Sequence, residues 1–224
     1  MNITCKLILC FILTFSANSG SSQVIQVDDF DRSSVGEFPI KWEMRGVKAK
    51  QEYLVSQDSV GNNYLSAKSL NSDMFILKKL KIDLVEYPYF NWSWRAIDLP
   101  LYGDESIREF CDTPASIAIV LKLSKWRPRS IKYTWSSTLE CGLVTKSPFA
   151  IWPSRTDIIV LKSGKNKGKN WQMEKRNVLK DYLSLYDKKE IKSLTIEAIV
   201  IMTDSDNTKS MSSADYRSMF FSKH

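Results

Sequence analysis

Seven polar residues in separate segments of the sequence have side chains suited to holding a ligand. Carboxylates, guanidinium groups and amides hydrogen-bond to hydroxyl-rich or ionic molecules, and an arginine can hold a carboxylate or sulfate with two parallel bonds. The candidates are Arg95, Asp112, Glu174, Arg176, Asp204, Asp206 and Asn207. The alternative role of these residues is structural, in strand-end hydrogen bonds and in ion pairs such as Glu174 with Arg176.

The histidine content excludes several kinds of catalysis. The sequence holds one histidine, His224, which is also its last residue. A chain end is a poor place for a positioned base or metal ligand. We therefore expect no Ser-His-Asp or Cys-His machinery and no multi-histidine zinc site. Hydrolysis by two carboxylates, or elimination by a tyrosine beside an arginine or lysine, stays open as the alternative to binding.

The segment Thr203–Thr208 carries the sequence Thr-Asp-Ser-Asp-Asn-Thr directly after an apolar stretch. Closely spaced carboxylate, amide and hydroxyl oxygens suit calcium, which prefers many oxygen ligands. An EF-hand is excluded, because Lys209 stands where that loop requires glycine. A calcium site of another geometry and an Asx-rich turn that caps its own backbone remain as alternatives. No other cofactor is expected.

The first residues have the pattern of a secretory signal peptide. Lys6 precedes a short apolar run, Leu7–Phe15, and small polar residues follow with Ala17 and Ser19 at cleavage-site positions. The run is too short to span a bilayer. We expect a signal peptide over residues 1–19, export to the periplasm or the medium, and no transmembrane segment in the mature chain.

Export leaves two cysteines in the mature chain, Cys111 and Cys141. In an oxidising compartment they could form one disulfide, and we expect this bond; two separate buried thiols are the alternative.

The positive charge is concentrated in one region. The formal net charge is +7, and the lysine excess lies between Lys162 and Lys192. Its densest part, Lys162–Asn170, has the composition of a solvated hairpin tip. Binding of an anionic envelope polymer is the alternative interpretation. Nucleic acid is excluded as a partner, because the sequence has no nucleic-acid-binding module.

Most of the sequence after the signal predicts β-strands. Phe90–Ile97 and Ser130–Ser136 alternate strictly between apolar and polar residues, which is typical of half-buried strands. Further strands are expected at 52–55, 64–67, 74–80, 115–123, 156–161, 171–175, 193–203 and 216–221. Asn177–Tyr186 has helical spacing, with Asn177 as its N-cap. These elements predict a single domain over residues 24–224, a two-sheet antiparallel β-sandwich of jelly-roll type with one short amphipathic helix.

Two of the strands carry aromatic side chains on one face. Trp92 and Trp94 lie on the first, and Tyr133 and Trp135 lie on the second. Such rings either fill the core of a sandwich or stack on sugars when exposed. We expect them in the core.

Several segments together resemble a bacterial exported family, the domain of unknown function 3047, over about residues 29–221. The segments that carry the resemblance are Asp29-Phe30, Pro39…Trp42, Trp92–Arg95, Asp112, Tyr133–Ser136, Trp152-Pro153, Trp171…Tyr182 and Ile201–Thr208. The seven candidate ligand-binding residues lie inside these segments. The resemblance implies a secreted β-sandwich similar to carbohydrate-binding modules, with no established reaction. The chain departs from the family pattern at Cys111, Ser116 and Arg217-Ser218, which implies an altered site.

These observations predict an exported, non-catalytic binding protein whose ligand is a glycan. A carbohydrate-active enzyme, either a polysaccharide lyase or a glycoside hydrolase, is the second hypothesis. A structural envelope protein that binds a partner is the third. The sequence leaves the oligomeric state open.

Overall fold

The computed structural model describes residues 23–45, 52–122, 129–150, 154–164, 170–186 and 190–224. The predicted signal peptide and residues 165–169 of the lysine-rich segment lie outside the described residues. Among the described residues, no helix has the length and hydropathy needed to span a bilayer.

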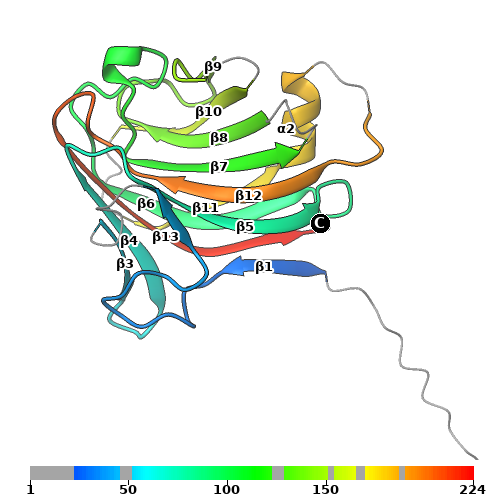
Figure 1. Ribbon diagram of the computed structural model, residues 1–224, viewed down its shortest axis with the longest axis horizontal. Helices are drawn as coiled ribbons and strands as arrows, with labels where there is room; N and C mark the ends of the chain where they lie inside the picture. The colour runs from blue at the N-terminus through cyan, green and yellow to red at the C-terminus, as the bar shows by residue number, and fades with distance from the viewer. Residues whose placement is uncertain (1–22, 46–51, 123–128, 151–153, 165–169, 187–189) are drawn as a thin grey trace, which may run out of the picture.

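The described strands form two sheets, which pack face to face (Figure 1). Sheet A contains β1 (Val24–Asp28), β3 (Tyr53–Gln57), β4 (Asn63–Leu70), β6 (Tyr89–Asp98), β11 (Gln172–Asn177) and β13 (Met211–Ser222). Sheet B contains β2 (Glu43–Arg45), β5 (Phe75–Asp83), β7 (Ala115–Lys122), β8 (Arg129–Ser136), β9 (Val144–Lys146), β10 (Arg155–Ser163) and β12 (Thr195–Met202).

The strand order is β11-β6-β13-β4-β3 in sheet A, where β1 also pairs with β13, and β2-β5-β12-β7-β8-β10-β9 in sheet B. The pairs are antiparallel except β8 with β10, which is parallel. The predicted two-sheet sandwich of jelly-roll type is therefore confirmed.

The space between the sheets is filled by the aromatic faces of β6 and β8. Trp92, Trp94, Tyr133 and Trp135 are each at most 2% exposed. The rings of Trp92 and Tyr133, from opposite sheets, lie 5.5 Å apart between centroids, and those of Trp94 and Trp135 lie 6.0 Å apart. These rings were expected in the core, and the structure places them there.

The other face of β8 is polar, and a loop covers part of it. Thr134 and Ser136 are fully buried. Their hydroxyls donate to the carboxylate of Glu105, in the segment between β6 and β7, at 3.2 and 2.6 Å, which compensates for the loss of water. This segment also contains a 3-10 helix, η1 (Arg108–Phe110). Gly103 lets the loop pack closely, since a Cβ there would lie 2.8 Å from the backbone oxygen of Asp112.

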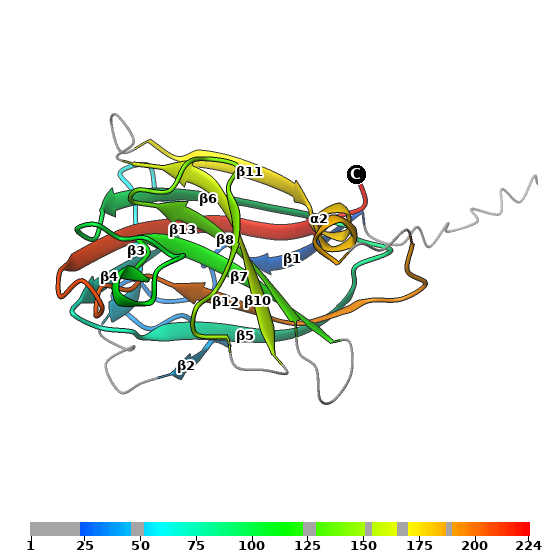
Figure 2. The ribbon, with the colours of Figure 1, turned by 90° about the horizontal axis from the view of Figure 1, so that it is seen from above.

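The predicted helix is present as α2 (Val178–Leu185), which lies at one end of the sandwich (Figure 2). Asn177 is its N-cap, as expected: the side-chain oxygen accepts a hydrogen bond from the backbone N–H of Lys180 at 2.9 Å. Val178 and Tyr182 face the core and are buried. The helix therefore closes the end of the sandwich beside β11.

The two tryptophans of β6 should respond differently to replacement by phenylalanine. Trp94 Nε1 donates to Glu174 at 3.3 Å, whereas Trp92 Nε1 is buried with no hydrogen-bond partner among the described residues. Both replacements remove similar ring area, but Trp92→Phe also removes an unsatisfied donor, whose burial costs about 1–3 kcal/mol. We expect Trp92→Phe to lower the free energy of unfolding by less than Trp94→Phe does in urea denaturation. An equal or larger loss for Trp92→Phe would contradict this assignment.

Candidate functional site

The turn after β12 is held in place by a carboxylate from a distant part of the chain. Asp112, which precedes β7, is fully buried. Its Oδ1 accepts from the backbone N and from Nδ2 of Asn207, and its Oδ2 accepts from the backbone N and Oγ1 of Thr208, at 2.6–3.2 Å. The turn is thus capped mainly by Asp112 and not, as one alternative had it, by its own side chains. Asp112 has a positioning role, because these four bonds occupy its oxygens.

Asp204, the first acid of the turn, is a buried carboxylate with an unusual protonation equilibrium. It is 3% exposed, and its Oδ1 accepts from the backbone N–H of Thr113 at 2.8 Å. Its pKa is raised to about 7, mainly by burial and also by the charges of Asp112 and Asp206, while Lys132 and the Thr113 N–H oppose the shift. Asp204 therefore exchanges a proton near neutral pH.

Asp206 lies nearer the surface and is also affected by its neighbours. Its pKa is raised by partial burial and by the negative charges of Asp112 and Asp73. Its Oδ1 accepts a hydrogen bond from Asn207 Nδ2 at 3.2 Å. Asp204 and Asp206 thus form a crowded pair of acids, for which a ligand that donates hydrogen bonds would relieve the repulsion.

These acids line a cavity of about 290 Å³ at one end of the outer face of sheet B, which we call the Asp204 pocket. Its lining residues are Asp73, Cys111, Lys132, Ser147, Phe149, Thr156, Met202, Asp204, Asp206 and Asn207. Lys132 enters from the polar face of β8. Phe149 is 44% exposed, and the Arg108 guanidinium lies 4.5 Å from its ring centroid. The pocket therefore combines carboxylates, an amide, an ammonium group and an aromatic ring.

The same acids are the place to test the calcium prediction. One carboxylate oxygen each from Asp112, Asp204 and Asp206 can be chosen so that all three lie within 4.8 Å of one another. A calcium ion needs six to eight oxygen ligands with available lone pairs. The oxygens of Asp112 are already occupied by four donors, so within this group of three acids Asp204 and Asp206 are left for an ion. Calcium binding stays a prediction.

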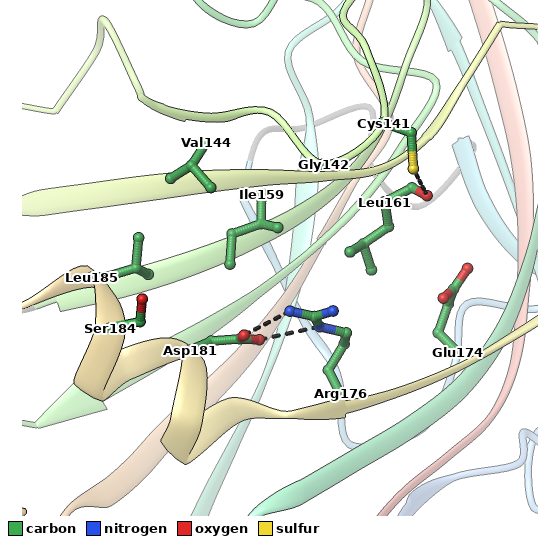
Figure 3. Close-up of a pocket in the computed structure, with 10 residues that line it drawn as sticks. All are labelled: Cys141, Gly142, Val144, Ile159, Leu161, Glu174, Arg176, Asp181, Ser184 and Leu185. Atoms are coloured by element: carbon green, nitrogen blue, oxygen red, sulfur yellow. Dashed lines mark hydrogen bonds and ion pairs between the residues drawn. The ribbon is translucent and has the colours of Figure 1, made fainter.

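Glu174 and Arg176 line a different cavity, of about 350 Å³, between the edges of the two sheets and α2 (Figure 3). We call it the edge cleft. Arg176 binds Asp181 through Nε and Nη2 at 3.1 and 2.6 Å, and Glu174 lies 3.3 Å from Lys162 Nζ. The ion pair between Glu174 and Arg176, named above as an example of the alternative structural role, is not formed, because each residue pairs with another partner.

Arg95 lies in neither cavity. It is on the outer face of sheet A, where its Nε and Nη2 contact Asp215 Oδ2 at 2.8 and 2.7 Å. Its guanidinium lies 4.6 Å from the ring centroid of Trp171 and 5.4 Å from that of Tyr64. The candidate residues thus fall into three places, with Asp112, Asp204, Asp206 and Asn207 together, Glu174 and Arg176 together, and Arg95 apart.

The predicted disulfide between Cys111 and Cys141 is not formed. Cys111 is buried with its Sγ 3.5 Å from the backbone oxygen of Glu105, and Cys141 is exposed with its Sγ 2.9 Å from the backbone oxygen of Leu161. The two thiols line different cavities, Cys111 the Asp204 pocket and Cys141 the edge cleft. The expectation failed because spacing along the chain does not show which face of the sandwich a residue reaches.

Sequence reasoning missed Lys132 and Phe149. Lys132 carried a usable signal, since it is the only charged residue on the polar face of the alternating segment Ser130–Ser136. Phe149 lies outside any periodic segment, so its type and position gave no signal. It reaches the Asp204 pocket because the connection between β8 and β10 passes beside the turn after β12.

Neutralising Asp204 should change the pH dependence of stability. A carboxyl with a folded pKa of about 7 and an unfolded pKa of about 3.9 binds more protons in the folded state, so its contribution is complete below about pH 4 and is lost as the pH rises through 7. We expect Asp204→Asn to raise the free energy of unfolding at pH 8 by an amount on the order of 3 kcal/mol and to flatten the profile between pH 4 and 8. Urea denaturation across this range measures both; Glu190→Gln, at an exposed residue, is the control and should leave the profile unchanged.

Solved structures resemble this chain only at low sequence identity and low TM-score. A family 12 xyloglucanase from Bacillus licheniformis in complex with ligand is 10% identical, with a TM-score of 0.43, over 88% of this chain and 90% of that chain. Endoglucanase cel12A from Rhodothermus marinus is 10% identical, with a TM-score of 0.40, over 80% and 94%. TmCBM61 in complex with beta-1,4-galactotriose is 11% identical, with a TM-score of 0.36, over 87% and 97%. Likeness of this degree does not specify a ligand.

No curated protein matches the sequence. A family model does: the one described as protein of unknown function (DUF3047) matches residues 40–220. This range runs from the segment before β2 into β13 and includes every residue of the Asp204 pocket and of the edge cleft. Because the match covers most of the sequence, the chain belongs to the DUF3047 family.

Proposed function

We propose that the protein is an exported glycan-binding protein and that a sugar unit occupies the Asp204 pocket. The observation that supports this proposal is the set of groups that line the pocket, which includes Asp204, Asp206, Lys132 and the exposed Phe149. Export rests on the N-terminal sequence alone.

The polar groups match the chemistry of a polyol. Sugar hydroxyls can donate to the carboxylate oxygens of Asp204 and Asp206, and they can accept from the Lys132 ammonium. A hydrogen bond to a charged group contributes about 1.5–3 kcal/mol, more than a neutral one. Because Asp204 changes its protonation near neutral pH, it can serve as acceptor or donor, and affinity should depend on pH in this range.

The apolar groups match the other half of a sugar. The faces of a sugar ring that carry C–H bonds stack on aromatic rings. Phe149 is held by Arg108, whose guanidinium lies over the ring and also donates to the backbone oxygen of Pro148 at 3.3 Å. A fixed ring loses little conformational entropy when a ligand packs on it, which favours binding.

One observation favours hydrolysis as a second candidate. Asp204 is protonated up to about pH 7, as a general acid must be, and Asp206 is a second carboxyl close to it. Glycosidases use such a pair, with the two groups in environments that separate their pKa values. Here burial raises the pKa of Asp206 as well, so the separation that hydrolysis requires is weakened. Binding without turnover is the better-supported function.

The test is titration calorimetry of the purified protein against cell-wall and outer-membrane polysaccharides. We expect saturable binding to at least one glycan, and Asp206→Asn should weaken it about tenfold because a charge-assisted hydrogen bond of 1.5 kcal/mol or more is lost. Glu86→Gln, remote from the pocket, should bind as the wild type does. Absence of binding by a well-folded sample across neutral and acidic glycans would count against the proposal.

The same samples separate binding from hydrolysis. Release of reducing ends from a bound glycan is measured over a day with the wild type and with Asp204→Asn. We expect no release by either protein. Release by the wild type that Asp204→Asn abolishes would establish the hydrolase instead.

A further inference from the structure

The edge cleft has two walls of different character. Glu174 and Arg176, two residues apart on β11, line one wall together with Asp181 of α2 (Figure 3). The facing wall is aliphatic and comes from β9 and β10, with Leu185 of α2 at one end (Figure 3). Its side chains are Val144, Ile159, Leu161 and Leu185. A ligand here would meet hydrogen-bonding groups on one side and hydrocarbon on the other.

The polar wall retains unused hydrogen-bonding capacity. Arg176 uses Nε and Nη2 on Asp181, and the Tyr133 hydroxyl can take one further N–H, so at least one of the two N–H groups of Nη1 has no acceptor among the described residues. Glu174 receives both Trp94 Nε1 and Lys162 Nζ on Oε1, which leaves Oε2 without a partner in the described part of the chain. Both side chains are partly buried, with exposures of 35% for Arg176 and 13% for Glu174. A donor and an acceptor are therefore both available inside the cleft.

The charges of this wall are already balanced. Arg176 pairs with Asp181 at 2.6 Å, and Glu174 pairs with Lys162 at 3.3 Å. An ionic ligand would gain little Coulomb energy from two neutral pairs and would still lose its hydration. A neutral ligand with hydroxyl groups avoids that loss, since a hydroxyl can donate to Glu174 Oε2 and accept from Arg176 Nη1.

We propose that the edge cleft is a second ligand site, separate from the Asp204 pocket, and that it takes one neutral sugar ring. Alternate residues on one face of a strand are spaced by about 7 Å, so the two polar groups can contact hydroxyls on opposite ends of a ring. The C–H face of the ring then packs on the aliphatic wall. The cavity volume of about 350 Å³ is within the range of small-molecule sites.

Cys141 offers a direct measurement of occupancy, because its thiol is exposed and lines the cleft. Cys111 is buried, and burial raises its pKa to about 12, so it reacts slowly with thiol reagents. In a chain with Cys5→Ser and Cys10→Ser, the rate of reaction with Ellman's reagent therefore reports on Cys141. The probes are glucose, galactose, mannose and N-acetylglucosamine at high millimolar concentration, with leucine as a zwitterionic comparison.

We expect at least one of the sugars to slow the reaction of Cys141 twofold or more and leucine to have no effect. Glu174→Gln keeps an acceptor for Trp94 Nε1, and Arg176→Lys keeps a partner for Asp181, so both variants should fold. Each variant alters one of the two groups that would contact the sugar, so both should lose most of the protection of Cys141. Lys175→Gln, whose side chain is exposed between these two residues on β11, is the matched control and should keep it. Thermal melting confirms that each variant is folded.

Three results would overturn the proposal: no protection by any of the four sugars, equal protection in Arg176→Lys and in the wild type, or protection by leucine alone. The last would assign the cleft to a zwitterion. Asp206→Asn should leave the protection of Cys141 unchanged, so failure of this site and failure of the Asp204 pocket are distinguishable.

Discussion

The layer of aromatic rings between the two sheets determines where polar chemistry can occur in this protein. Strict alternation on β6 and β8 places their large rings inward, so the hydrophilic residues of these strands are confined to the outer faces and edges. The rings also have polar tips, and two of these tips have partners at the edge cleft. Trp94 donates to Glu174 at 3.3 Å, and Tyr133 donates to Asp181 at 2.7 Å. The aromatic core therefore orients Glu174 and Asp181 of the edge cleft through the indole N–H of Trp94 and the hydroxyl of Tyr133.

The two cavities differ in how their charges are compensated. In the edge cleft each charged group has a counter-ion within 3.3 Å, which leaves a neutral surface. In the Asp204 pocket, burial and the charge of Asp112 raise the pKa values of both Asp204 and Asp206, and Lys132 opposes the shift of Asp204 only partly. The first arrangement offers hydrogen-bonding groups without a net charge, whereas the second stores electrostatic repulsion that a ligand or a proton can relieve. The buried carboxylate of Asp112 keeps the second arrangement in place by holding Asn207 and Thr208.

Local pattern was sufficient for the fold but only partly for the sites. Alternation at Phe90–Ile97 and the N-cap Asn177 each depend on a few neighbouring residues, and both were predicted correctly.

Asp204, Asp206 and Asn207 were grouped correctly because they adjoin in sequence. Arg95 lies apart from Asp204, and the sequence could not show this, since whether the two share a face depends on which sheet each strand joins. Lys132 and Phe149 reach Asp204 through strand order and through a long connection, neither of which has a local signature. The short strands β1, β2 and β9 were missed for the same reason, because pairing partners and not intrinsic pattern define them.

The parallel pairing of β8 with β10 has a consequence for communication across the molecule. Parallel neighbours cannot be joined by a tight hairpin, so the chain between Ser136 and Arg155 must travel back along the sheet before β10 begins. On the way it supplies Cys141, Gly142 and Val144 to one cavity and Ser147 and Phe149 to the other. A single crossover thus forms part of the wall of both. If occupancy of one cavity displaces this crossover, thermodynamic linkage requires that each ligand change the affinity of the other by the same factor.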